Sequence, residues 1–113
     1  MSALNVTAAA SPLFNNFLMC VSVSDATTGA PTTGLKPPNF LIAHLASLNH
    51  AAELDRTVSS VKEGPPGFYI VQLAPWAPQP TLPAGHYVFA VAVNAGTKAK
   101  PTNGQTVAWG AIP

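Results

Sequence analysis

The chain of 113 residues has few charged side chains: they make up 8% of its residues, and the formal net charge is +1. Globular domains usually carry about 25% charged residues. The five Lys and Arg residues form no basic patch, so nucleic-acid binding is not expected. Two interpretations of so neutral a surface stay open. Thr, Ser, Asn and Gln can coat an ordinary soluble domain, or a partner can cover part of the surface in an assembly.

Cysteine occurs once, at Cys20, so no disulfide can form within the chain. Because Cys20 stands between Met19 and Val21, we expect a small buried hydrophobic residue rather than a nucleophile. No apolar run reaches the ~18 residues of a membrane span. The first residues lack the basic and apolar segments of a secretory signal. The compartment stays open, because a single cysteine is compatible with the cytoplasm and with non-classical export.

The twelve prolines avoid every apolar run that reads as a strand, as ladder hydrogen bonding requires. The runs cover residues 16–24, 39–45, 56–63, 68–74, 86–93 and 105–111, with a possible seventh near 4–8. Short strands separated by turn signals predict an all-β fold. We expect one domain over residues 1–113, a single antiparallel β-sandwich of six to eight strands. At most one short helical turn is expected, near residues 47–54, where leucines recur at helical spacing.

Alternation with period two assigns a core face to two of these runs. The expected core residues are Phe17, Met19, Val21 and Val23 in the first, and Tyr87, Phe89, Val91 and Val93 in the second. In the last run Thr106, Ala108 and Gly110 oppose Val107, Trp109 and Ala111, and we expect Trp109 in the core. His86 is expected to face outward. The opposite faces are small and neutral, which fits a second covered face.

Two short phrases carry a family resemblance. Val21-Ser22-Val23-Ser24-Asp25, followed by Thr28-Gly29-Ala30-Pro31, resembles the first strand and turn of transthyretin-like and immunoglobulin-like accessory modules. Pro83-Ala84-Gly85-His86-Tyr87 is similar to the turn before a late strand of immunoglobulin-like domains, where a tyrosine makes a corner contact. The cysteine pair and core tryptophan of antibody domains are absent, and nothing matches the hormone-binding or hydrolytic transthyretin relatives. The resemblance therefore implies a scaffold and no activity.

Residues that could support catalysis are sparse. The chain has no nucleophile elbow, phosphate-binding loop or dinucleotide fingerprint. His44, His50, Glu53 and Asp55 lie close in sequence and could form a metal site, but their spacing matches no known zinc pattern. A solvated loop is the favoured interpretation of this segment. We therefore predict no catalytic residue, no cofactor and no metal.

The sequence predicts a non-enzymatic structural or protein-interaction module, a subunit or adaptor in a larger or homo-oligomeric assembly. The expected contact regions are the proline-stiffened segment 75–83 around Trp76, the loop 95–103 with Lys98 and Lys100, and the uncharged N-terminal arm with Phe14. Burial of neutral apolar surface or addition of a strand at a free edge would supply the binding energy. The expected partner is a protein or a second copy, with no nucleic acid and no membrane span.

A lectin-like module that binds a glycan or a small molecule is the alternative. An exposed Trp76 on a stiff loop, or Tyr69 or Tyr87, could stack on a sugar ring. Against this, Trp76 could fold back and cap the open end of the sandwich. Binding that is lost in a Trp76→Ala variant, with the oligomeric state unchanged, would favour the glycan interpretation.

Overall fold

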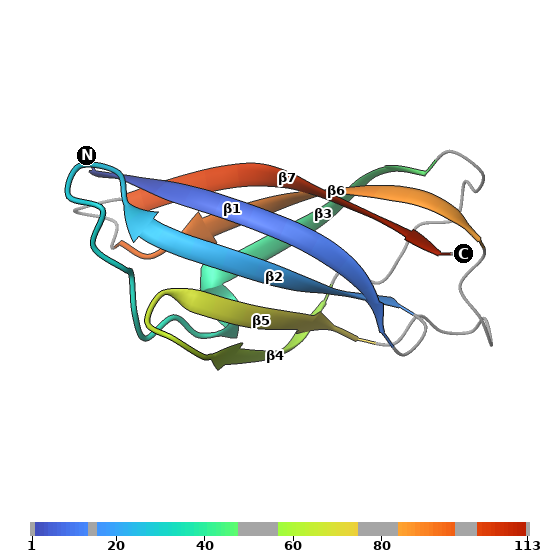
Figure 1. Ribbon diagram of the computed structural model, residues 1–113, viewed down its shortest axis with the longest axis horizontal. Helices are drawn as coiled ribbons and strands as arrows, with labels where there is room; N and C mark the ends of the chain where they lie inside the picture. Colours follow the sequence, from blue (N-terminus) through green and yellow to red (C-terminus); the bar gives the residue numbers. More distant parts are fainter. Residues whose placement is uncertain (1, 14–15, 48–56, 75–83, 97–101, 113) are drawn as a thin grey trace.

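The computed structural model describes residues 2–13, 16–47, 57–74, 84–96 and 102–112. Its elements are β1 (Ser2–Leu13), β2 (Asn16–Asp25), the 3-10 turn η1 (Pro37–Asn39), β3 (Phe40–Ser47), β4 (Val58–Glu63), β5 (Phe68–Leu73), β6 (Gly85–Asn94) and β7 (Thr102–Ile112). The all-β class is confirmed, because η1 is the one helical element in these residues. Each expected run corresponds to a strand (Figure 1).

The strands form one seven-stranded sheet in the order β3-β6-β7-β1-β2-β5-β4. Every pairing is antiparallel except that of β1 with β7, which is parallel and joins Ser2 to Thr102 and Ala3 to Asn103. The sheet curls into a half-barrel (Figure 1) and does not separate clearly into the two antiparallel sheets of a sandwich. The parallel pairing of β1 with β7 corrects the prediction of a wholly antiparallel fold, and the two-sheet sandwich stays a prediction.

Aromatic rings fill the inside of the half-barrel. Phe17 of β2 packs on Tyr87 and Phe89 of β6, with ring centroids 5.3 and 5.1 Å apart. Phe40 of β3 contacts Tyr69 of β5 in the same way, at 5.4 Å. These contacts join strands that are distant in the sheet order. The expected core faces of β2 and β6 are confirmed, since every residue assigned to them is buried.

The last strand, β7, buries its small residues and exposes its large ones. Ala108 and Gly110 face the interior, and Trp109 is 64% exposed, so the prediction that Trp109 belongs to the core is wrong. The reason is the close approach of β7 to its neighbours. A Cβ atom at Gly110 would lie 2.8 Å from Cε1 of Phe17 and 2.9 Å from the carbonyl oxygen of Ala10. Only glycine or a very small residue fits on that side.

The N-terminal segment is a strand rather than a free arm. β1 runs from Ser2 to Leu13 and pairs with β2 from Leu4 to Leu13, so it extends well beyond the expected 4–8. Pro12 lies inside it, opposite Phe17, although prolines were expected to avoid strands. Beyond Ala3 the ladder of β1 runs on one side only, and proline is tolerated in such edge positions. The expected helical turn near 47–54 falls outside the described residues, except for Ser47, which ends β3.

Two side chains tie the loop between β2 and β3 to β4 and β5. The carboxylate of Glu63 accepts hydrogen bonds from the backbone N–H of Gly34 at 3.1 Å and of Gly67 at 2.9 Å. The hydroxyl of Tyr69 donates to the Thr32 carbonyl at 2.6 Å and accepts from the Leu35 N–H at 3.3 Å. The amide donors, first that of Gly67, lower the pKa of Glu63 below its ordinary value.

Candidate functional site

Five of the seven strands contain no Asp, Glu, Lys or Arg: β1, β3, β5, β6 and β7. Of these, β3, β6 and β7 are adjacent at one end of the sheet order. The charged residues within the described ranges all lie in β2, in β4 or in the loop before η1: Asp25, Lys36, Lys62 and Glu63. Outward-facing strand residues normally carry much of a domain's charge. β1 replaces charge with exposed polar residues such as Asn5 and Thr7, whereas β3 and β7 expose Leu41, Val107 and Trp109.

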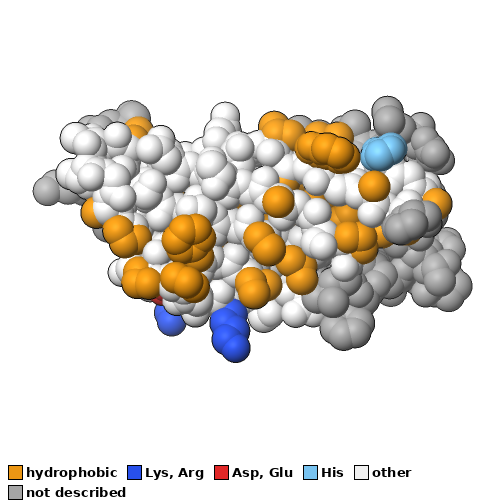
Figure 2. Space-filling view, in the orientation of Figure 1, with side chains coloured by type: hydrophobic (Ala, Val, Ile, Leu, Met, Phe, Trp, Pro, Cys, Tyr) orange, Lys and Arg blue, Asp and Glu red, His pale blue; other side chains and the backbone are white. Residues whose placement is uncertain are grey.

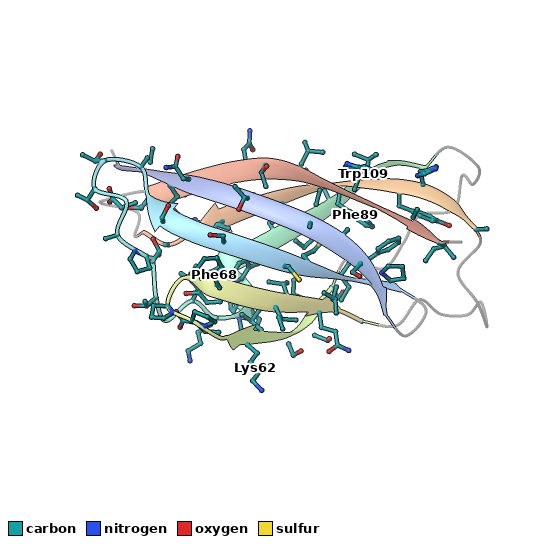
Figure 3. The ribbon with its side chains drawn as sticks, viewed as in Figure 1. Lys62, Phe68, Phe89 and Trp109 are labelled. Atoms are coloured by element: carbon teal, nitrogen blue, oxygen red, sulfur yellow. The ribbon has the colours of Figure 1, made fainter. Side chains whose placement is uncertain are left out.

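Large and small apolar side chains alternate across the outer side of these strands. The register sets Leu41 beside Ala92, Ala43 beside Ala90 and Ala90 beside Val107. Leu41 is 70% exposed, Val107 56% and Trp109 64%. We call this surface the neutral face, and its members are Leu41, Ala43, Ala90, Ala92, Val107 and Trp109. Trp109 stands on the outer side of β7, whereas Phe89 points into the interior (Figure 3).

A shallow pocket of about 530 Å³ lies at the Leu41 end of the neutral face. The carboxamides of Asn39, Asn94, Asn103 and Gln105 contribute to its lining. Asn39 has a structural role, because its amide donates to the Asn94 carbonyl at 2.8 Å and its oxygen accepts from the Lys36 N–H at 2.7 Å. The pocket therefore extends the neutral face with uncharged polar groups and adds no ionic group.

At the other end of the neutral face the ring of His86 lies 6.0 Å from that of Trp109, centroid to centroid. His86 is exposed, as the sequence predicts. Ala111 pairs with His86 across the ladder, and Val88 pairs with Trp109. Neither of these two partner side chains has a polar atom. Among the described side chains, this end of the neutral face therefore offers few hydrogen-bonding groups beside the imidazole of His86.

A second apolar surface lies over β1, β2 and β5. It is an open groove of about 610 Å³, whose floor is formed by short side chains, among them Ala9 and Cys20. Phe68 and Ile70 border it and are 55% and 49% exposed. Cys20 is exposed, so the expectation of a buried cysteine is wrong. Its outward position follows from alternation, because Met19 and Val21 on either side take the core face.

Lys62 is the charged residue among those that line the groove. It pairs in register with Ile70 and extends from β4 beyond the edge of the sheet (Figure 3). The nearby carboxylate of Glu63 is held by backbone amides, as is that of Asp25, which accepts from Thr27 and Thr28. Those amides, Thr28 first, lower the pKa of Asp25. The groove thus differs from the neutral face in having a cation at its border.

Figure 2 displays the contrast between the two regions. Hydrophobic side chains gather over β5 and β4 at the lower left and over β7 at the upper right, and the lysines among the described residues in view lie along the lower edge. The exposed large hydrophobic residues of the described ranges belong to these two surfaces: Leu41, Phe68, Ile70, Val107 and Trp109.

Most of the residues singled out from the sequence lie outside the described ranges. This holds for Trp76, Phe14, Lys98 and Lys100, and for His50, Glu53 and Asp55. His44 lies in β3, but its side chain is not among those described. Tyr69 and Tyr87 are 2% and 1% exposed, so neither can offer its ring to a sugar. In the described part of the chain no three His, Cys, Asp or Glu side chains gather as metal ligands.

Sequence reasoning missed Trp109 as a surface residue, because alternation alone does not say which face of a strand is buried. The alternation of the last run was recognised, and only the choice of buried face was wrong.

The described residues include no helix with the length and hydropathy needed to cross a bilayer. Comparisons of the chain with protein-family models, with curated proteins and with solved structures found no match.

Proposed function

We propose that this chain is a non-enzymatic interaction module that docks onto a protein through the neutral face. The observation that carries the proposal is the combination of three adjacent strands without a charged residue and the exposure of Leu41, Val107 and Trp109 on them. Burying such a surface releases water from apolar groups and desolvates no ion. Contiguous exposed apolar surface on a soluble domain is typical of a contact site.

The strand order supports an immunoglobulin-like scaffold for the module. Constant-type immunoglobulin domains group their strands as A-B-E-D and C-F-G. Lettered in chain order, β1-β2-β5-β4 has the first order and β3-β6-β7 has the second. Tyr87 lies near the start of β6, where such domains place their corner tyrosine. On this assignment the neutral face is the outer side of the C-F-G group.

The shape of the neutral face favours a protein over a glycan or a small molecule. Small ligands are usually enclosed over most of their surface, and the neutral face is an open side of a sheet. Sugar hydroxyls also need hydrogen-bonding partners, and Val88 and Val107 beside Trp109 offer none. Trp109, with Val88 and Val107 beside it and the ring of His86 6.0 Å away, has instead the composition of a protein–protein hot spot.

Site-specific photo-cross-linking in cells that produce the protein tests the proposal. A benzophenone amino acid replaces Val107 on the neutral face or, as the matched control, Ser60, which is exposed on β4. We expect a defined protein adduct from position 107 and none from position 60. The absence of any adduct from position 107, or the same adducts from both positions, would contradict docking through the neutral face.

A further inference from the structure

We infer that the partner of the neutral face is a second copy of this chain, related by a two-fold axis. The inference rests on the proposed function and adds the identity of the partner. A two-fold interface places one surface against itself, so a charge near the axis meets a like charge from the other copy. The six residues of the neutral face avoid this repulsion, because β3, β6 and β7 carry no Asp, Glu, Lys or Arg and His86 lies at the margin of the face.

The side-chain sizes in the central register row of the neutral face fit such self-pairing. A two-fold axis that lies in the interface along β6, the middle strand of the face, sets β7 of one copy over β3 of the other. In the register row of Ala43, Ala90 and Val107, the large Val107 then faces the small Ala43 of the second copy. Ala90 lies on the axis and faces its own counterpart. In this row a large residue opposes a small one, as interdigitated sheet packing requires. In the row of Leu41, Ala92 and Gln105, Leu41 faces the uncharged Gln105 of the second copy.

The size of the face limits the affinity. Three strands spaced by about 4.8 Å, with about eight residues each at 3.3 Å per residue, cover on the order of 400 Å² per copy. Stable complexes bury about 800 Å² per partner. We therefore expect a weak dimer, with a dissociation constant on the order of 10–100 µM. Such an interface is suited to a subunit that gains further contacts within a larger assembly.

Sedimentation velocity over a concentration series measures the association directly. We expect the wild-type protein to shift from monomer to dimer as concentration rises through the micromolar range. Val107→Glu places a charge against the second copy and should weaken dimerisation at least about tenfold. Ile70→Glu is the matched control, since Ile70 is exposed to a similar degree on the groove, and it should leave dimerisation unchanged. Circular dichroism of both variants checks that they fold.

A thiol cross-link tests the geometry. In a Cys20→Ser, Ala90→Cys variant, the two introduced thiols face each other across the axis, and a short bis-maleimide should join them. The wild-type chain supplies the control, because its one cysteine is exposed over the groove. We expect a covalent dimer from the variant and none from the wild type. Cross-linking through Cys20 alone would place the interface on the groove and overturn the inference.

Different experimental results would overturn docking through the neutral face and pairing with a second copy. A monomer at every concentration, combined with a photo-adduct from position 107 that contains another protein, overturns self-pairing and leaves docking through the neutral face intact. A monomer that gives no adduct from position 107 overturns both. Equal weakening by Val107→Glu and Ile70→Glu overturns the assignment of the interface to the neutral face.

Discussion

The contact between β1 and β7 should be the most sterically sensitive part of the fold. Gly104 and Gly110 of β7 lie against β1 so closely that an added methyl group would overlap its atoms. A Cβ at Gly104 would be 2.5 Å from the Leu4 carbonyl oxygen and 2.8 Å from Cγ2 of Val6. Gly104→Ala and Gly110→Ala each force the two strands apart. We therefore expect both substitutions to destabilise the domain, although alanine suits a strand better than glycine does.

The expected loss follows from two opposing terms. Overpacking a tight site costs about 1–3 kcal/mol, and replacing glycine by alanine returns about 0.4–1 kcal/mol through the unfolded chain. Relief by side-chain movement is restricted at Gly110, because Phe17 is fully buried between Tyr87 and Phe89. We expect a net loss of about 1–2 kcal/mol for each variant. For a domain of this size that lowers the melting temperature by about 4–8 °C.

Urea unfolding followed by fluorescence or circular dichroism provides the measurement, with a lower midpoint and an unchanged slope as the expected result. Gly64→Ala is the control: a Cβ there meets nothing within 4 Å, and the residue has no left-handed backbone conformation. It should be neutral or slightly stabilising. If Gly104→Ala and Gly110→Ala are as stable as Gly64→Ala, β7 does not approach β1 as closely as described here.

Three further predictions concern the groove and the hydrogen bonds by which Glu63 and Tyr69 tie the loop between β2 and β3 to β4 and β5. Glu63→Gln should lower the melting temperature at neutral pH. The pKa of Glu63 is depressed in the folded state. The contribution of Glu63 to the free energy of unfolding is therefore complete above the ordinary pKa of 4.5 and is lost as pH falls through the depressed pKa. A stability gap between wild type and variant that persists at lower pH would contradict this. Tyr69→Phe removes the hydrogen bonds to Thr32 and Leu35 and should lower the free energy of unfolding, measured with denaturant, by about 1–2 kcal/mol. Unchanged stability would contradict a stabilising role of these hydrogen bonds. Cys20 should react with a water-soluble maleimide in the native protein, and protection until denaturant is added would contradict its exposure.

The strands were predictable because their sequences contrast strongly with the turns. Period-two alternation identified the core faces of β2 and β6, where bulky residues occupy one face and small residues the other. The extent of β1 was not predictable in the same way. Its second half, Ala8-Ala9-Ala10-Ser11-Pro12, has neither β-branched residues nor a hydrophobic rhythm. That segment is a strand because β2 pairs with it, which is a tertiary effect.

The buried face of β7 could not be chosen from its own residues. Large residues are normally assigned to the interior, and here Trp109 and Val107 face outward. The choice is set by the distance to β1 and to Phe17, which admits only glycine and alanine on the inner side. Alternation therefore gave both faces correctly and could not say which of them meets the core. The candidate site was missed for the same reason, since its largest side chain was assigned to the interior.

The few charged residues of the chain are unevenly distributed over the strands. β4 is an exposed edge strand of ordinary kind, with Ser59, Ser60 and Lys62 on its accessible positions. β6 belongs to the same sheet, and its residues from Tyr87 to Val93 are apolar on both faces. Strands with two apolar faces are typical of sheets that are covered on both sides. The inner side of β6 is covered by the core, and its apolar outer side belongs to the neutral face on which our proposal places the partner.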